Sequence, residues 1–348
     1  MEVTDDSRAS WWRGEVAQVL EPSTDRVVPP CPVAGLCGGC DWQHVALPRQ
    51  RALKADLIAE QMLRLAHLDA AVTVEAVPGD DDGLAWRTRM RYLANAGEVG
   101  LRGALSHDLV ALPPSGCLLA APGGPGVSEL SALAAGLPDQ AEICVTVAEG
   151  ATVWSPGRGV LAGEEVVTQH ALGRDYAVRA DGFWQVHPGA AAALSKAVLA
   201  ALEPQPGERA LDIYCGVGLF AGALATAGAE VFGVERNRAA IALARRNVPE
   251  ARFSAARAEG PAWLSMAKWK QAELVVLDPP RAGAGEAVVN RVVAARPRAV
   301  AYVACDEAAL ARDAAAFARL GYAMTSLWAF DIFPMTSHVE CVARFEML

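Results

Sequence analysis

Apolar and polar residues alternate with different periods in the two halves of the chain. After about residue 181, short apolar runs typical of buried strands alternate with stretches whose apolar residues recur at helical spacing. Strands that alternate with helices usually form a sheet with helices on both faces. The pattern therefore predicts a doubly wound α/β domain, with strands over 209–213, 231–234, 273–277 and 300–303 and helices over 189–202 and 308–320.

The first half of the chain has a different pattern. Short apolar runs separated by Gly and Pro turns predict a mainly antiparallel β region over about 72–180. Apolar residues at helical spacing predict an amphipathic helix over 48–68. A strand pattern over 14–20 resembles the end of a small β-barrel that is too short to be complete. We therefore expect three domains, a truncated barrel remnant, a mainly β central domain and the α/β domain, over 1–29, 30–180 and 181–348.

Composition narrows the class of protein. A length of 348 residues with 53% hydrophobic and 20% charged residues is typical of a globular protein with two or three domains. No apolar run approaches the roughly 18 residues that a membrane helix needs, and residues 1–10 are acidic and polar, so we expect no membrane span and no signal peptide. This predicts a cytoplasmic protein.

Charge disfavours a general nucleic-acid coat protein but leaves room for a local RNA contact. The formal net charge is -9, whereas phosphate contacts need basic residues. In the segment 86–92, however, Arg87, Arg89 and Arg91 alternate with other side chains, so one face of a strand would carry three positive charges. These arginines either contact RNA or are solvated surface charges.

A cluster of cysteines predicts a metal or iron-sulfur site. Cys31, Cys37 and Cys40 lie within one glycine-rich segment of ten residues, and Cys117 follows in a distant turn. Glycines let the backbone fold around an inorganic core and direct amide donors at its sulfurs. Zinc is the alternative, because four cysteines also satisfy tetrahedral zinc. Zinc modules usually pair two Cys-x2-Cys units, so three bunched ligands and one distant ligand favour iron and sulfur.

A glycine turn in the α/β half predicts a nucleoside cofactor. The predicted strand 209–213 leads through Gly216 and Gly218 into a helix, and such a turn brings a ligand close to backbone amides. The next strand ends at Glu235, about 20 residues further on, where an acid can bind ribose hydroxyls. The third glycine of the dinucleotide fingerprint is missing, which favours S-adenosylmethionine over NAD. Asp278 ends a third strand, either on the ligand-binding edge of the sheet or as a helix cap.

Cys305 is a candidate nucleophile. It lies between a predicted strand and a helix with an acidic first turn, where a helix N-terminus can lower the pKa of a thiol. Taken alone, it would more often be a small buried hydrophobe. Near the C-terminus, His338 and Glu340 open a final strand. His338 alone would be an ordinary turn residue, and Glu340 could lie on the exposed side of an edge strand.

Six motifs in order make the chain resemble the RNA uracil-5-methyltransferase family, specifically its iron-sulfur branch that modifies ribosomal RNA. The resemblance covers nearly the whole chain. It is carried by the four cysteines, by Phe183-x-Gln185-Val, by Asp212-Ile-Tyr-Cys-Gly-Val-Gly-Leu-Phe, by Asp278-Pro-Pro-Arg, by the Cys305 segment that ends in Leu-Ala-Arg-Asp, and by Thr336-Ser-His-Val-Glu340.

The resemblance implies a fold and a reaction. The fold is a Rossmann-like methyltransferase domain beside a central domain with a 4Fe-4S cluster and a TRAM-like N-terminal remnant. Cys305 matches the nucleophile that attacks uracil carbon 6, Asp278 would hold the ring, and Glu340 matches the base that removes the proton from carbon 5. S-adenosylmethionine would contact Gln185, Asp212, Tyr214, Gly216, Gly218, Glu235 and Asp278, and RNA would contact Arg87, Arg89, Arg91 and Phe183.

The substrate implied is a uridine in 23S ribosomal RNA, handled by a monomer, and a transfer RNA uridine at position 54 is the alternative. The chain departs from the family's pattern at Glu307, where proline is usual, at His187, where asparagine is common, and over 254–259, which lacks a clear aspartate for the adenine. Two other classes stay open. An amino-group methyltransferase with a zinc module would give Cys305 and Glu340 no role, and so would a non-catalytic iron-sulfur RNA binder or redox sensor.

Overall fold

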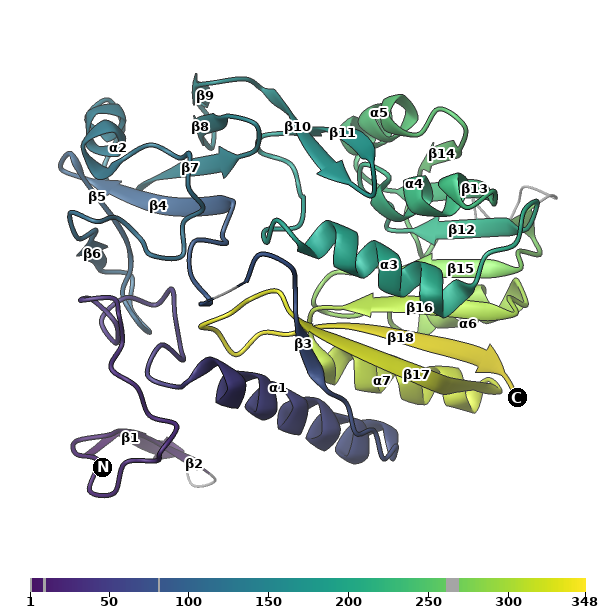
Figure 1. Ribbon diagram of the computed structural model, residues 1–348, viewed down its shortest axis with the longest axis horizontal. Coiled ribbons are helices and arrows are strands. Elements are labelled where there is room, and N and C mark those ends of the chain that lie inside the picture. Colours follow the sequence, from purple (N-terminus) through teal and green to yellow (C-terminus); the bar gives the residue numbers. More distant parts are fainter. Residues whose placement is uncertain (1, 9–10, 81, 261–268) are drawn as a thin grey trace.

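An eight-stranded mixed sheet organises the computed structural model, which describes residues 2–8, 11–80, 82–260 and 269–348 (Figure 1). The strand order is β14-β13-β12-β15-β16-β18-β17-β3. The first five are parallel, and β18 runs antiparallel between β16 and β17. In chain order the strands are β3 (Val74–Ala76), β12 (Arg209–Ile213), β13 (Glu230–Glu235), β14 (Arg252–Ala255), β15 (Leu274–Leu277), β16 (Ala299–Ala304), β17 (Tyr322–Asp331) and β18 (Glu340–Met347).

Helices cover both faces of this sheet because alternate strand residues point to opposite sides. Leu274 and Val276 pack in one core with three helices, and Val275 and Leu277 pack in a second core with four helical segments. The first face carries α3 (Ala190–Leu202), α4 (Leu219–Thr226) and α5 (Arg238–Asn247). The second carries α6 (Glu286–Ala294), α7 (Glu307–Arg319), α1 (Leu47–Gln61) and its π-helical end η1 (Met62–Ala66). The predicted doubly wound domain is thus confirmed.

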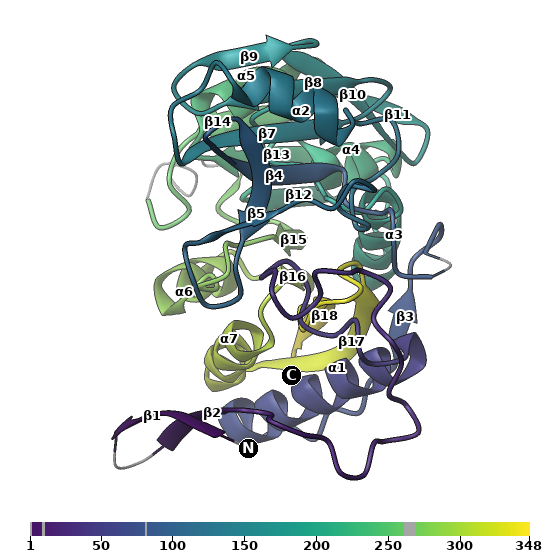
Figure 2. The same cartoon turned by 90° about the vertical axis from the view of Figure 1, so that its left-hand side faces the viewer.

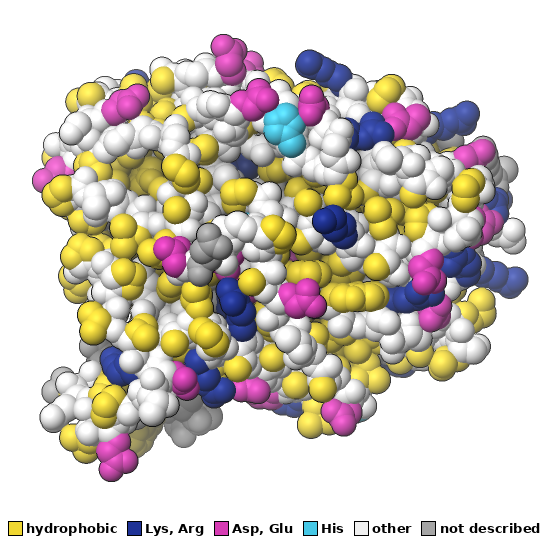
Figure 3. Space-filling view, in the orientation of Figure 1, with side chains coloured by type: hydrophobic (Ala, Val, Ile, Leu, Met, Phe, Trp, Pro, Cys, Tyr) yellow, Lys and Arg dark blue, Asp and Glu magenta, His cyan; other side chains and the backbone are white. Residues whose placement is uncertain are grey.

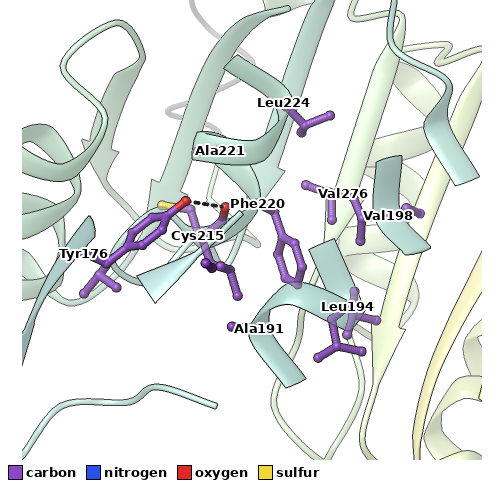
Figure 4. Packing of buried hydrophobic residues seen from close by; sticks show 14 of the residues in the cluster. Tyr176, Ala191, Leu194, Val198, Cys215, Phe220, Ala221, Leu224 and Val276 are labelled. Atoms are coloured by element: carbon purple, nitrogen blue, oxygen red, sulfur yellow. Dashed lines mark hydrogen bonds between the residues drawn. The ribbon is translucent and has the colours of Figure 1, made fainter. Parts of the chain in front are cut away.

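Figure 4 shows the first core where the α/β domain meets the hairpin that precedes it. Phe220 points between Leu194 of α3 and Val276 of β15, and Tyr176 lies beside the turn that contains Cys215. The Tyr176 hydroxyl donates to the carbonyl of Leu219 at 3.2 Å. Because this phenol and its partner are both buried, the hairpin has a defined position relative to the glycine turn.

The region predicted as mainly antiparallel β forms a separate sheet, visible at the upper left of Figure 1. Its order is β6-β5-β4-β7-β8-β9, and every pair is antiparallel, as predicted. A further antiparallel hairpin joins it to the α/β domain. The elements are β4 (Arg89–Asn95), β5 (Glu98–Arg102), β6 (Leu109–Ala111), α2 (Val127–Ala134), β7 (Ala141–Val147), β8 (Ala151–Ser155), β9 (Gly159–Ala162), β10 (Val166–Ala171) and β11 (Arg174–Arg179).

Two early segments differ from the simple division of the chain. Strand β3 pairs in parallel with β17, and α1 packs against the second face of the large sheet, although both precede the antiparallel sheet in the sequence (Figure 2). At the N-terminus, β1 (Glu2–Arg8) pairs only with β2 (Trp11–Glu15) among the described residues. The strand predicted over 14–20 therefore ends at Glu15, because the residues beyond it have no partner strand.

The surface carries both signs of charge. On the face seen in Figure 3, Lys and Arg side chains are interspersed with Asp and Glu, with no broad basic field. Among the helices of the described residues, none is long and apolar enough to cross a bilayer.

Candidate active site

The three predicted catalytic residues meet at one edge of the large sheet. Asp278 directly follows β15, Cys305 directly follows β16, and Glu340 is the first residue of the antiparallel strand β18. The start of an antiparallel strand lies beside the ends of its parallel neighbours, and Ala304 is paired with Cys341. Cys305 therefore lies beside Glu340 across the strand pair. This is the edge on which ligands bind in open α/β sheets.

A cleft of about 1210 Å³ opens at this edge. It contains all three catalytic candidates together with most of the residues predicted to bind cofactor or RNA. The predicted residues that line it are Arg87, Phe183, Gln185, Tyr214, Gly216, Glu235, Asp278, Cys305 and Glu340. Asp212, Gly218, Arg89 and Arg91 do not line it. The convergence of catalytic side chains beside the glycine turn is the geometry that the proposed reaction requires.

Burial raises the pKa of all three side chains, and neighbouring carboxyls add to the shift at Glu340 and Cys305. Burial raises the pKa of Asp278 to about 7. Burial and the nearby Asp278 raise the pKa of Glu340 well above its ordinary value, while Arg281 acts in the opposite direction. Glu340 is only 3% exposed and belongs to a strand between two others, so the alternative that it lies on an exposed edge is wrong. Carboxyls with such raised pKa values can hold or release a proton near neutral pH.

The predicted effect of the helix end on Cys305 is wrong in this structure. Burial, followed by the carboxyls of Glu340 and Asp278, raises the pKa of Cys305 to about 12, and Arg281 only partly opposes them. Helix α7 begins two residues later, at Glu307, and its N-terminus is capped by the Asp306 carboxylate, which accepts from the Ala309 amide at 2.7 Å. Burial and the two nearby carboxyls therefore outweigh the helix dipole.

The glycine turn has the backbone shape that its residues predict. Tyr214, Gly216 and Gly218 all have positive φ, of 69°, 52° and 95°. A side chain at Gly216 would meet no protein atom within 4 Å, so this position leaves the cleft open for a ligand. At Gly218, by contrast, a Cβ would approach Val248 Cγ2 at 3.2 Å, so this glycine serves the packing of α4 rather than the cleft wall.

Asp212 lies beneath the turn rather than in the cleft. It is fully buried, and its Oδ2 accepts from the Ala221 amide of α4 at 2.8 Å. Its Oδ1 has no hydrogen-bond partner among the described residues. Burial raises the pKa of Asp212 to about 8. Asp212 therefore anchors the helix that follows the glycine turn, and its orphaned oxygen marks a polar position directly below the cleft.

The arginines of the segment 86–92 diverge instead of sharing one face. Arg87 lines the cleft. Arg89 is largely buried and donates to the carbonyls of Ala180 and Gly182 at 3.0 and 2.8 Å, and burial lowers its pKa to about 10. Arg91 is exposed and pairs with Glu142 away from the cleft. Because β4 starts only at Arg89, the expected row of three charges does not form, and Arg87 alone faces the candidate site.

The four predicted metal ligands line one small cavity of about 20 Å³. Two of the thiols accept hydrogen bonds, Cys40 from Gln43 Nε2 at 3.1 Å and Cys37 from the Gly39 amide at 3.4 Å. Burial raises the pKa of Cys40 to about 11 and also raises that of Cys37. Among the described residues, no three His, Cys, Asp or Glu side chains are arranged to hold a metal ion. Four cysteine sulfurs are suitable ligands for either an iron-sulfur cluster or zinc. In this structure, however, the described side chains are not arranged in the geometry of a metal site.

Sequence reasoning missed several residues of the cleft. Arg281 stands in a quoted motif without an assigned role, yet its guanidinium is the cation that influences both Cys305 and Glu340, and it contacts the ring of His338 at 3.3 Å. Asp41 lines the cleft and accepts from the Ser337 backbone and hydroxyl. The position of Arg281 after Asp-Pro-Pro was a usable signal, whereas nothing near Asp41 in the sequence pointed to residue 337.

The fold and the cleft define a methyltransferase. The family profile described as methyltransferase small domain matches residues 191–303. A solved structure, the Pyrococcus abyssi tRNA (uracil-54, C5)-methyltransferase in complex with S-adenosyl-L-homocysteine, superposes with a TM-score of 0.72 at 24% identity, covering 97% of this chain and 88% of that one. That likeness establishes the fold.

The sequence relatives identify the family. The chain is 41% identical to an uncharacterized RNA methyltransferase of Streptomyces avermitilis, over 97% of this chain and 87% of that protein. It is 33% identical to the 23S rRNA (uracil(1939)-C(5))-methyltransferase RlmD of Pseudomonas fluorescens, over 96% of this chain and 83% of that protein. The chain belongs to the RNA uracil-C5-methyltransferase family.

Proposed function

We propose that the protein methylates carbon 5 of a uridine in 23S ribosomal RNA, with Cys305, Glu340 and Asp278 as its catalytic residues. The observation that carries the proposal is their position in one cleft beside the glycine turn. The name of the Pseudomonas fluorescens relative supports ribosomal RNA as the substrate class. An amino-group methyltransferase would leave this buried thiol and carboxyl without a role.

Cys305 performs the first step. Carbon 5 of uracil is a weak nucleophile, and thiolate addition at carbon 6 moves the electrons of the carbon 5–carbon 6 double bond into an enolate. Since the Cys305 pKa is raised to about 12, attack requires its proton to leave, and the cation of Arg281 favours the thiolate. Asp278, with a pKa of about 7, can donate a hydrogen bond to the developing enolate oxygen.

Glu340 performs the last step. Carbon 5 of the enolate takes the methyl group from the sulfonium, which leaves as a neutral thioether, and carbon 5 then carries both a methyl group and a proton. The Glu340 carboxylate removes that proton, the electron pair re-forms the carbon 5–carbon 6 double bond, and the thiolate of Cys305 leaves. Burial keeps Glu340 away from bulk water, where its carboxylate would be a weaker base.

The cleft fits S-adenosylmethionine, which supplies an electrophilic methyl group when bound. Gly216 leaves space against the backbone, and Gln185 and Tyr214 line the same wall. Glu235 ends β13, and its Oε1 accepts from the Asn237 amide at 2.7 Å, which orients the carboxylate for ribose hydroxyls. Asp212 would support cofactor binding indirectly, because it anchors helix α4 behind the glycine turn.

RNA would approach from the open side of the cleft. Phe183 is 72% exposed on the cleft wall, where a flipped base can stack on its ring. Arg87 supplies a positive charge on the same wall. The paired strands β1 and β2 are proposed as part of a barrel remnant that adds little RNA contact of its own.

A covalent trap tests the reaction. In RNA that carries 5-fluorouridine, fluorine takes the place of the carbon 5 proton that the base must remove, so the last step is blocked. The wild-type protein should then form an adduct that survives denaturing electrophoresis. Cys305→Ala should form no adduct and transfer no methyl group. Methyl transfer that continues in Cys305→Ala would overturn the mechanism. Mapping 5-methyluridine in a deletion strain then decides between ribosomal RNA and transfer RNA, because the site that loses its methyl group is the substrate.

We also propose that the four cysteines hold a 4Fe-4S cluster. All four thiols line one cavity, and Gln43 and Gly39 donate to two of the sulfurs, as is common for cluster ligands. Protein purified without oxygen should be brown and contain iron and sulfide. Colourless protein with one zinc per chain would overturn the cluster assignment while leaving the methyl transfer proposal intact.

A further inference from the structure

The loop that leads to Glu340 is held in place by a distant part of the chain. This loop, residues 332–339, connects β17 to β18 and lies beside the N-terminal segment before α1 (Figure 1). The Met335 carbonyl accepts from the amides of Asp41 and Trp42, both at 3.0 Å. Met335 itself has a positive φ of 65°, a shape that a non-glycine residue keeps only when its surroundings hold it.

Gln50 of α1 provides the second restraint. Its side chain is fully buried, and its Oε1 accepts from the Met335 amide at 2.9 Å. Its Nε2 donates to the carbonyls of Trp42 and Val45 at 3.0 and 2.8 Å. One amide side chain therefore joins the helix, the segment after the cysteines and the catalytic loop, with its donors and acceptor all used.

Asp41 provides the third restraint, closest to the base. Its Oδ2 accepts from the Ser337 amide at 3.3 Å and from the Ser337 hydroxyl at 3.2 Å. Ser337 is three residues before Glu340, and Asp41 directly follows the cysteine at position 40. A displacement of the cysteine segment would thus be passed to the loop within a few residues of Glu340.

The restraints share a small core with the cysteine cavity. Trp86, Leu119 and Met335 form this core, and Cys40 and Cys117 pack against it. Met335 therefore belongs to the core against which two of the predicted cluster ligands pack. The active-site loop and the cysteine segment form one packed unit, although nearly the whole chain lies between them in sequence.

We propose that Asp41 and Gln50 are positioning residues that align Glu340 for proton removal, so that release of the methylated RNA depends on the cysteine-bearing segment. This inference rests on the proposed function, with Glu340 as the base. Cys305 and Asp278 lie on other loops, so attack and methyl transfer continue when the restraint is lost. The proton then stays on carbon 5, the bond between Cys305 and carbon 6 persists, and the protein accumulates as a covalent complex with RNA.

The experiment measures covalent complex and turnover on unmodified uridine RNA with the full-length protein. Asp41→Ala removes the bonds to Ser337 from an exposed side chain, and Gln50→Met removes the amide at nearly constant volume. We expect release to slow about fivefold in Asp41→Ala, from lost hydrogen bonds, and on the order of a hundredfold in Gln50→Met, from misplacement of the base. Both should accumulate complex, and amide exchange over 333–339 should become faster.

Matched controls separate positioning from general damage. Asp56→Ala removes an exposed carboxylate from α1, the helix that carries Gln50, and Gln169→Met makes the glutamine-to-methionine change on β10, so neither should accumulate complex. Slower turnover without complex in Asp41→Ala would overturn the inference, including when Gln50→Met does not fold. Glu340→Gln should accumulate the most complex. If it forms none, the assignment of Glu340 as the base fails, and this inference fails with it.

Discussion

Two loops lie next to proposed catalytic residues, and they are anchored from different parts of the chain. The loop 279–285 follows Asp278 and is anchored within the α/β domain by Asp313 of α7. The loop 332–339 precedes Glu340 and is anchored from residues 41–54, at the other end of the chain. The first anchor is close to its loop in sequence, and the second comes from nearly 300 residues earlier in the chain. On the proposed mechanism, the position of Asp278 depends on an anchor within the α/β domain, whereas the position of Glu340 depends on the N-terminal segment as well.

The local anchor is a buried acid with several donors. Asp313 Oδ2 accepts from the Tyr302 hydroxyl at 2.5 Å and from the Ala284 amide at 2.7 Å, and the Gly285 amide donates to both of its oxygens. A side chain at Gly283 would approach Asp313 Oδ2 at 2.8 Å, so the loop fits closely against this carboxylate. Asp313 thus fixes the loop that carries Arg281 to the helix that follows Cys305.

Breaking the local anchor should have the largest effect. Asp313→Ala leaves a buried hydroxyl and two amides without their acceptor, which costs about 3–5 kcal/mol of unfolding free energy. Methyl transfer should fall on the order of a hundredfold without accumulation of covalent complex, because the loop serves the attack. Urea unfolding and the complex assay measure both.

Arg319→Ala is the matched control on the same helix. Its exposed guanidinium pairs with Glu286, and surface pairs contribute about 0–1 kcal/mol. Complex that builds up in Asp313→Ala would contradict the division between an early and a late loop.

Removing the cation that the local loop presents should have a smaller effect. Arg281 lowers the pKa values of both Cys305 and Glu340, so Arg281→Gln raises both further and reduces the thiolate fraction. One pKa unit reduces kcat/KM about tenfold at pH 7. Because pH 7 to 9 lies well below the Cys305 pKa of about 12, each pH unit raises the thiolate fraction by the same factor in both proteins, so the deficit should stay constant over this range.

A pH profile of kcat/KM measures this prediction. Arg252→Gln makes the same charge change on β14, remote from the cleft, and should keep the wild-type profile. A deficit in Arg281→Gln that lies entirely in KM, with kcat unchanged, would show that Arg281 acts by contact with RNA rather than through ionisation.

Asp212 offers a test on stability alone, with no effect on the chemical steps required. Its pKa is about 8 in the folded state and about 4 when unfolded, so the folded protein binds the extra proton between these values. Its contribution to stability is complete below pH 4 and is lost as pH rises to 8, by up to about 1.4 kcal/mol for each pH unit.

Asp212→Asn keeps an acceptor for Ala221 but does not ionise, so it should unfold at a higher urea concentration than the wild type at pH 9 and at a similar one at pH 4. Equal urea midpoints at pH 9 would mean that Asp212 ionises freely in the folded protein. The two proteins together test whether Asp212, beneath the glycine turn, keeps its proton at neutral pH in the folded protein.

Much of the fold could be predicted from periodicity. Strand β16, predicted over 300–303, spans Ala299–Ala304, and α7, predicted over 308–320, spans Glu307–Arg319. Strand–turn–helix units are local, so their residues reveal them. The pairing of β3 with β17 could not be predicted. A strand of three residues is too short to show a clear alternation of apolar and polar residues, and its partner lies far along the chain.

The site was predictable in its residues more than in its electrostatics. Cys305, Asp278 and Glu340 were found from strand ends and motifs, and all three line the cleft. The raised pKa of Cys305 was not predicted, because it depends on burial and on two acids from other strands. The separation of Arg87 from Arg89 and Arg91 was missed since the strand begins later than its alternating pattern suggests.

By itself the sequence determined which side chains are candidates for the chemistry and which local elements hold them, because strands, glycine turns and helix starts are encoded over a few residues. The tertiary structure alone decided what those side chains experience. It buried Glu340 between β16 and β17, raised the pKa of Cys305, and attached the loop before Glu340 to Asp41 and Gln50. Burial and long-range hydrogen bonds arise only when distant segments pack together, so no local pattern can report them.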